Sequence, residues 1–287
     1  MSSPFATPDA VKSLAWDVKG VAPKDVLPEA LILRAASKAG VVEGDAPAVR
    51  VPYLSLDAGA FVPEGTTIED TLPDDSEVVI HTGKIASLVP LSREQYGQDD
   101  VASLLSEAMK RDLLRKANAA FLAQAAPEAP AVTPPAGLIY QSPTTLSTDP
   151  IEVVGSLDPL ADAIATVEAA GAALADLVIV ASPVAWATIV KLKAATDSNT
   201  SLLGAGVDAV ERRLLSVPVL VDRDAPAASL LLIDRHAVLA AYGEVSIATS
   251  ADARFADDVV LVRGLWRFGA KIVDANRVVL VDVLDVS

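Results

Sequence analysis

The chain has 287 residues and a net charge of −15, from 23 Lys and Arg residues against 38 Asp and Glu residues. This balance argues against a nucleic-acid-binding surface, because Lys and Arg dominate phosphate contacts. The sequence has no cysteine, which excludes disulfides and thiolate chemistry.

No stretch of the sequence has the character of a membrane span or a secretion signal. No apolar run reaches the ~18 residues that a membrane-spanning helix needs. The N-terminal stretch MSSPFATPDAVKSLAW lacks the basic flank and the apolar core of a signal peptide. We therefore expect a soluble protein made in a cytoplasm, without membrane contact.

Residues 1 to about 48 are interrupted by prolines and are expected to form an arm. One short helix is predicted over residues 28–38, with Pro28 at its first position and Gly40 just beyond its end. The rest of this stretch is expected to be disordered alone, so it needs another surface to lie on.

Residues 49–91 predict two strands around a long tip. Residues 49–54 alternate in the strand pattern, and residues 77–91 contain runs of β-branched side chains. The stretch between them, DAGAFVPEGTTIEDTLPDDS, is far longer than the roughly two to five residues of ordinary hairpin loops. We expect an extended loop that docks through its apolar residues.

Residues 98–124 predict one long helix, because they contain no Gly or Pro and are rich in strong helix formers. Asp99 and Asp100 are expected to cap its start. Two acid–base pairs are spaced four residues apart, as intrahelical ion pairs require: Glu107 with Arg111, and Asp112 with Lys116.

The apolar stripe of this helix drifts around its surface. It starts with Val101, Leu104, Leu105 and Ala108 and continues with Leu113, Leu114, Ala117 and Phe121. A straight helix packed on one small core does not need such a drift. We therefore expect the helix to have different neighbours along its length.

A Pro- and Ala-rich connector over residues 125–137 precedes an α/β pattern that starts near residue 139. A helix is predicted over residues 158–174, with Asp158 as its cap, and Ser182 is expected to cap the next one. The strands predicted in this half of the chain cover residues 177–181, 214–221 and 229–234, part of 237–250, and most of 255–283.

Few residues could carry catalysis. The only histidines are His81 and His236, and a Ser-His-Asp triad with Asp234 would lack the G-x-S-x-G motif. The acidic pairs at 74–75 and 99–100 are interpreted as a turn and a helix cap rather than as cation ligands. The sequence therefore predicts no catalytic residue, no metal site and no cofactor.

Several segments, in their order, carry a family resemblance. They are KIASLVPLSREQYGQDDVASLLSEAMKRDLLRKANAAFL (84–122), PAGLIY (135–140), LVIVASPVAWATIVKLKAATDSNTSLLG (177–204) and FADDVVLVRGLWRFGAKIVDANRVVLV (255–281). Each segment alone is a weak pattern, whereas the order of the segments along the chain is specific for one family. The chain resembles the major capsid protein of tailed double-stranded DNA bacteriophages, over most of residues 49–284.

The resemblance implies an α+β fold, the tailed-phage major capsid fold. Its expected parts are an N-terminal arm (1–48), an extended β-hairpin loop with flanking strands (49–91), the spine helix of a peripheral domain (92–124), an axial α/β domain (125–254), and a return through the peripheral domain with a final axial strand (255–287). Some members cross-link subunits through a Lys on the loop. No Lys lies between Val51 and Gly83 here, so non-covalent contacts are expected instead.

The implied function is structural. Subunits would assemble into hexamers and pentamers in the bacterial host cytoplasm and close an icosahedral virion head around double-stranded DNA, which is enclosed without sequence-specific binding. The implied partners are further copies of the chain, a portal protein and, where assembly needs them, separate scaffolding and decoration proteins. No N-terminal scaffolding segment is expected, because Met1 comes barely a hundred residues before the spine helix.

The residues expected at subunit contacts lie in three places. They are Phe5 and Trp16 of the arm, Leu56, Phe61, Val62, Ile68 and Leu72 of the loop, and Arg263 and Arg267 near the C-terminus. The two arginines lie four apart in a predicted strand and so share one face. Solvent exposure and ion pairs to a neighbouring subunit are equal alternatives for them.

Two other functions fit parts of the pattern. An encapsulin-type nanocompartment shell shares the fold and would enclose protein cargo. A cytoplasmic α/β enzyme would use the long helix as a scaffold and would need a concave site with a perturbed acid or base. The scarcity of His and the absence of Cys weigh against the enzyme.

Overall fold

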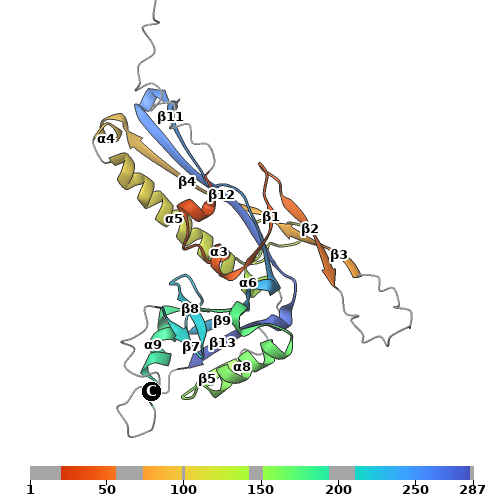
Figure 1. Cartoon of the computed structure of the whole chain (residues 1–287). Coiled ribbons are helices and arrows are strands. Elements are labelled where there is room, and N and C mark those ends of the chain that lie inside the picture. The colour runs from red at the N-terminus through yellow and green to blue at the C-terminus, as the bar shows by residue number, and fades with distance from the viewer. Residues whose placement is uncertain (1–20, 56–73, 99–100, 142–150, 194–210, 285–287) are drawn as a thin grey trace, which may run out of the picture.

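A computed structural model of the chain describes residues 21–55, 74–98, 101–141, 151–193 and 211–284. These residues form a body that is much longer than it is wide, with a long helix and a sheet in one half and a second sheet in the other (Figure 1). A two-stranded ribbon projects from one side of this body.

The first sheet has five strands and is organised around β12 (Val259–Ile272). On one edge, β12 pairs antiparallel with β4 (Gly83–Ser92) along the whole of β4. On its other edge it pairs first with β11 (Ser246–Arg254) and then with β10 (Val238–Tyr242). Strand β1 (Ser37–Val41) adds parallel to β10.

The long helix α5 (Val101–Ala123) lies along one face of this sheet (Figure 1). Its buried side chains recur every four residues, at Met109, Leu113, Ala117 and Phe121. A Cβ atom added to Gly264 of β12 would lie 3.1 Å from both Leu113 and Met109, so glycine allows the helix to approach the strand closely. The short helix α4 (Arg93–Tyr96) begins at Ser92 with a capping box.

The prediction for the first part of the apolar stripe is wrong. Leu104 was expected to be buried and is 63% exposed, whereas Met109 is buried. The expectation of different neighbours along the helix is confirmed. Met109 lies against Gly264 of the first sheet and outside the cluster of Phe121 and Leu122, which also contains side chains of the second sheet.

The second sheet has six strands. In spatial order they are β5 (Ile151–Val154), β13 (Val278–Leu284), β9 (Ser229–Asp234), β6 (Leu177–Ala181), β8 (Val217–Val221) and β7 (Arg213–Leu214). Helices α8 (Asp158–Ala169) and α9 (Pro183–Lys191) share one hydrophobic cluster with this sheet. Ser182 caps α9 as predicted, whereas Leu157 rather than Asp158 takes the cap position of α8.

Strand β6 shows why the two halves form one core. Leu177 and Ile179 point into the cluster of α8 and α9, whereas Val178 and Val180 point into a second cluster on the other face. That second cluster also contains Phe121 of α5 and residues of the first sheet. Every side chain of β6 is therefore buried, as expected for a fully apolar strand.

The N-terminal segment differs from the predicted helix over residues 28–38. Helix α2 (Pro23–Val26) is followed by α3 (Leu31–Ala35), and the chain then becomes strand β1. Leu31 and Ile32 are buried in the cluster shared with α5. Residues 31–41 of the expected arm are thus integrated into the body, because pairing with β10 replaces the helix that local sequence favours.

Residues 77–91 form two strands rather than one. Strand β3 (Asp74–His81) pairs with β2 (Ala48–Ser55), and β4 joins the other sheet. The chain changes sheet at Thr82, whose backbone N–H donates to Pro47 O (2.9 Å) and whose hydroxyl donates to Ala46 O (2.6 Å). These two bonds satisfy the backbone and hydroxyl donors of Thr82, which is buried at the junction. No local sequence pattern predicts them.

The connector and the remaining turns complete the chain. Residues 125–137 lead from α5 to α6 (Leu138–Gln141), whose Gln141 bonds Ala270 O and the Ile272 N–H on β12. Strands β10 and β11 fall within the range expected for the axial domain, but they pair with β12 in the five-stranded sheet. The described residues also include four short 3₁₀ helices: η1 (Leu174–Asp176) between α8 and β6, and η2 (Arg235–Ala237), η3 (Phe255–Asp257) and η4 (Ala275–Arg277) between strands.

Asp112 links α5 to β4, and its replacement by Asn should lower the free energy of unfolding near pH 7. Its carboxylate accepts from Lys116 Nζ (2.8 Å) and Ser87 Oγ (3.0 Å). The Lys116 ammonium lowers the pKa of Asp112 below its ordinary 3.8; partial burial opposes this, and the Ser87 hydroxyl adds to the lowering. A carboxyl with a lowered pKa stabilises the fold above its ordinary pKa and ceases to do so as pH falls through the lowered value.

The difference between parent and Asp112→Asn in urea denaturation of unassembled subunits should therefore be present at neutral pH and shrink as pH falls below 3.8. Glu107→Gln is a matched control, because Glu107 forms no ion pair with Arg111 or any other described residue, contrary to the predicted pair. A pH-independent loss for Asp112→Asn would contradict this account.

Candidate inter-subunit surfaces

The β2–β3 ribbon is the most protruding described feature (Figure 1). The two strands pair from Ala48↔His81 to Ser55↔Asp74. At the base, Val51 and Ile80 are buried against the body, while Tyr53 and Val79 are 38% and 36% exposed. Burial at one end holds the ribbon on the body, and the rest of it stands free of the body's core.

The residues predicted to dock this loop lie beyond the ribbon's described part. Leu56, Phe61, Val62, Ile68 and Leu72 belong to residues 56–73, and Phe5 and Trp16 belong to residues 1–20; both ranges are outside the described residues. Their roles at subunit contacts therefore stay predictions. What the structure supplies is the direction of the strands that lead into the loop.

Arg263 and Arg267 lie on the face of β12 that points away from α5. The alternate residues Val262, Gly264 and Trp266 are the buried ones. The spacing argument is therefore right that both arginines share one face. Opposite Arg263 on β4 lies Leu88, which is 56% exposed.

The two guanidinium groups have different surroundings. Arg267 donates to Thr82 Oγ1 (3.2 Å) and Ala46 O (3.4 Å), and its Nη2 lies 3.4 Å from Asp45 Oδ1. It thus ties the end of the ribbon to the sheet within its own subunit. Arg263 is exposed and forms no hydrogen bond or ion pair with the residues the structure describes, so its charge is available to a neighbour.

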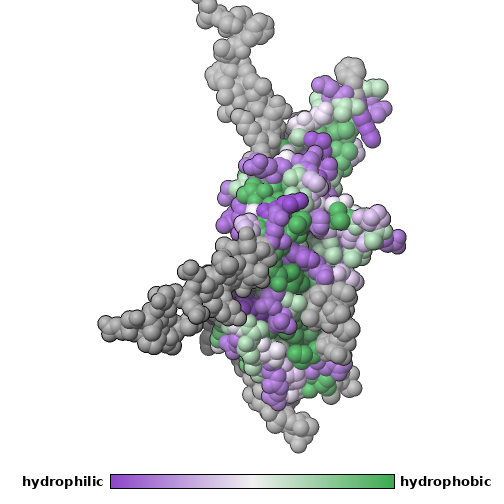
Figure 2. Space-filling model, turned by 90° about the vertical axis from the view of Figure 1, so that its right-hand side faces the viewer, coloured by the Kyte–Doolittle hydropathy of each residue, from purple (hydrophilic) through white to green (hydrophobic). Residues whose placement is uncertain are grey.

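Leu88 and Leu104 are exposed apolar residues; Leu104 was expected in the buried stripe of the long helix, and no contact was predicted for Leu88. Leu88 could have been recognised from the alternation of β4, because it lies on the same face of the strand as Lys84, and Ile85 and Val89 lie on the opposite face. Figure 2, which views the side from which the ribbon projects, shows hydrophobic surface scattered among polar side chains rather than gathered in one field. Apolar residues spread in this way are normal on a protein surface, so neither residue alone marks a contact.

His236 and Asp234 do not form the arrangement that a Ser-His-Asp triad requires. Asp234 accepts from the His236 backbone N–H (2.9 Å) and faces Arg277 Nη1 (3.4 Å), so it does not orient the imidazole. His236 Nδ1 lies 3.5 Å from Ser37 Oγ, and Nε2 lies 3.6 Å from Asp176. Both contacts are long, and the His236 side chain is 64% exposed.

The part of the chain that the structure describes offers neither a metal-binding cluster nor a membrane-spanning helix. In the described ranges, no group of three or more His, Asp or Glu residues is placed to hold a metal ion. Among the helices the structure describes, none is long and apolar enough to cross a membrane.

Comparison with known proteins places this fold. Residues 39–283 match the model of the phage capsid family. A search of curated proteins found no match. Among solved structures, a chain from Microbacterium phage Oxtober96 is similar at a TM-score of 0.65 and 16% identity, covering 99% of this chain and 100% of that one.

Two further structures agree. A chain from Gordonia phage Cozz matches at a TM-score of 0.63 and 18% identity, covering 89% of this chain and 86% of that one. The capsid of a native GTA particle is similar at a TM-score of 0.63 and 17% identity, covering 100% of this chain and 96% of that one. At these identities the structures share the fold, and the family match extends over nearly the whole sequence. The predicted α+β capsid fold is confirmed, and the chain belongs to the phage capsid family.

Proposed function

We propose that the chain is the major capsid protein of a tailed phage, whose copies form hexamers and pentamers and close an icosahedral head around double-stranded DNA. Family membership supports the structural role, and the ribbon supports the mode of assembly. Obligate interfaces typically bury more than roughly 2,000 Å². A projecting ribbon adds interface area without enlarging the subunit core.

Partners other than further copies of the chain follow from the same proposal. A head that is filled with DNA needs a portal protein at one vertex. A separate scaffolding protein and a decoration protein are further candidates. Assembly would take place in the bacterial host cytoplasm, and the finished protein would lie in the virion head.

Electron microscopy of the purified protein after size-exclusion chromatography tests this function. Closed shells or rings of five and six subunits are the expected result. Shells that contain protein cargo instead of DNA when purified from the native source would favour an encapsulin-type compartment. A subunit that stays small at high concentration, with residues 74–91 equally protected from hydrogen exchange at every concentration, would contradict self-assembly.

The substitution Phe61→Asp should leave soluble subunits but impair shells, because a carboxylate would replace the largest apolar side chain of the loop. Burying an unpaired charge at a contact costs several kcal/mol in order-of-magnitude terms. Shell yield by sedimentation and electron microscopy is the measurement. Val184→Asp is the control, since Val184 is 59% exposed on α9, on the other side of the body from the β2–β3 ribbon. Normal shells from the Phe61 variant would remove the loop from the proposal.

A further inference from the structure

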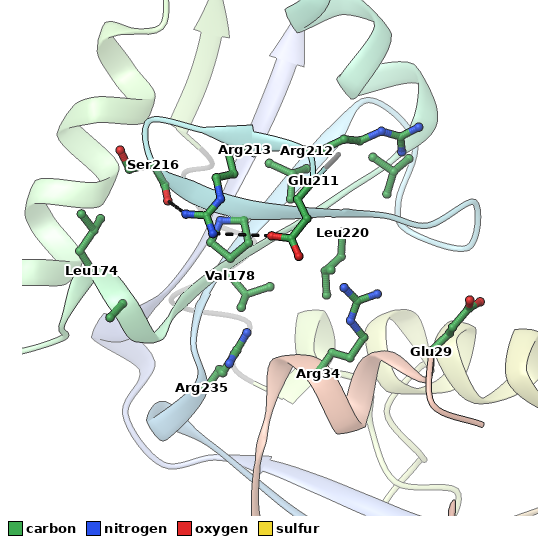
Figure 3. Close-up of a pocket in the computed structure, with 14 residues that line it drawn as sticks. Glu29, Arg34, Leu174, Val178, Glu211, Arg212, Arg213, Ser216, Leu220 and Arg235 are labelled. Carbon is green, nitrogen blue, oxygen red and sulfur yellow. Dashed lines mark hydrogen bonds and ion pairs between the residues drawn. The ribbon is translucent and has the colours of Figure 1, made fainter. Parts of the chain in front are cut away.

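A pocket of about 770 Å³ lies between α3 and the β7–β8 edge of the second sheet. Among the residues that line it are Arg34, Arg212, Arg213 and Arg235. Figure 3 shows Arg34, Arg213 and Arg235 approaching the cavity from three different elements, while Arg212 points away. Arg212 instead lies over the ring of Trp186, 5.9 Å from its centroid. We call this cavity, with Arg34, Arg213 and Arg235, the arginine pocket.

The cations of the arginine pocket outnumber its acids, since Glu29 and Glu211 are the acidic residues among the described residues that line it. Glu211 lies 3.6 Å from Arg213, and both side chains are more than half exposed, so this pair is weak. Arg34 and Arg235 form no ion pair with any described residue. The Nε of Arg235 is buried and has no hydrogen-bond partner in the described part of the chain. A buried donor without an acceptor is costly, so an acceptor from outside the described residues would stabilise this site.

The chemistry of the pocket selects carboxylates or similar anions. Guanidinium groups bind planar anions through paired hydrogen bonds. Three of them converging on one cavity are unusual in a chain with a net charge of −15. An acidic peptide would supply both the missing charge and the missing acceptors.

The chain itself contains a segment of this kind. Residues 56–73 carry Asp57, Glu64, Glu69 and Asp70 and no Lys or Arg. The ribbon that leads into this segment points away from α3, β7 and β8 of its own subunit (Figure 1). A donor on one side of a subunit and a receptor on another make a head-to-tail contact, which forms a ring when the rotation between subunits closes.

We propose that the arginine pocket binds the acidic 56–73 segment of a second copy of the chain. This inference rests on the proposed self-assembly and adds the site and its chemistry. The contact would pair Glu69 or Asp70 of one subunit with Arg34 and Arg235 of the next. It would also supply acceptors to the Arg235 Nε.

Disulfide trapping tests the placement directly, because the chain has no cysteine of its own. The variant carries Ser216→Cys at the pocket and Thr71→Cys in the acidic segment. Mild oxidation of assembled shells should give a ladder of covalently linked chains on a denaturing gel. Each single-cysteine variant is the control and should give no ladder. Shells without a ladder, or a disulfide within one chain, would overturn the inference.

A charge swap tests the energetics. Arg34→Glu combined with Arg235→Glu should lower shell yield about tenfold or more, as should Glu69→Lys combined with Asp70→Lys, because each leaves like charges facing one another. Mixing the four changes in one chain should restore assembly. Arg223→Glu, outside the pocket and 63% exposed, is the matched control and should assemble normally.

The outcomes separate this inference from the proposed function. If the parent protein forms no shells or rings, self-assembly fails before any variant is compared. If the parent forms shells and the Arg34/Arg235 variant forms them at parental yield, self-assembly stands and the arginine pocket is not the docking site. If the pocket variant is insoluble, the disulfide ladder still decides, since Ser216→Cys keeps every arginine.

Discussion

Replacing Trp266 with Ala should lower the free energy of unfolding by about 3–5 kcal/mol, the usual cost of emptying a buried aromatic site. Trp266 is 1% exposed at the centre of β12. Its indole N–H donates to Gly243 O (3.1 Å), and its ring lies 4.7 Å from the ring of Phe268. Truncation would leave both a cavity and a buried carbonyl oxygen without its donor.

The loss should be seen as a lower urea midpoint for unassembled subunits and as a fall in soluble yield, since stabilities of domains are only about 5–15 kcal/mol. Trp186→Ala is the matched control. Trp186 is half-buried in the cluster of α9, so it should lose clearly less stability. Equal losses at the two positions would show that the five-stranded sheet and α5 are not the more tightly packed part of the molecule.

The long helix illustrates what sequence can predict. Its composition and length depend on local propensity, so Val101–Ala123 was accessible from the residues alone. Its first buried positions were not, because Leu104 is exposed and the first fully buried side chain that the structure describes on this helix is Met109. The predicted Asp112–Lys116 pair is present at 2.8 Å, since it needs only the helix itself.

Strand pairing is less accessible, because it depends on residues far apart in the sequence. Ser37–Val41 has little apolar character, yet it pairs with β10, about 200 positions later. The separation of β3 from β4 depends on two bonds at Thr82 to the 46–47 turn. Local propensity contains no information about either partner.

In the candidate contact surfaces, too, the features set by local spacing could be predicted from the sequence, and those that depend on distant segments could not. The spacing of Arg263 and Arg267 predicted one shared face, which is a property of any strand. The bonds of Arg267 to Thr82 and Ala46 depend on a turn about 220 positions earlier. The arginine pocket is likewise invisible in the sequence, because Arg34, Arg213 and Arg235 come from three separate segments.

Replacing Asn118 with Leu should destabilise the subunit by about 2–4 kcal/mol, because one buried amide joins three segments. Asn118 is 4% exposed on α5. Its Oδ1 accepts from the Leu31 backbone N–H (3.0 Å), and its Nδ2 donates to Asp222 Oδ2 (2.7 Å). Leucine keeps the branched shape of the amide but is larger, so the loss would combine the missing hydrogen bonds with some overpacking and would leave no cavity. Chemical denaturation of unassembled subunits is the measurement.

A reciprocal exchange separates the role of this link from simple destabilisation. Asn118→Asp alone keeps the acceptor for Leu31 but places a second carboxylate against Asp222, so it should be destabilising near pH 7 and less so in acid. Adding Asp222→Asn restores a donor–acceptor pair, because the new amide can donate to the new carboxylate, and it should recover most of the stability. Because Asp222 directly follows β8 of the second sheet, the exchange also tests whether this bond fixes the angle between the two halves of the body. If the double variant regains stability but its shells differ in size or fail to close, the bond sets subunit geometry. If stability and shells recover together, its contribution is to folding alone.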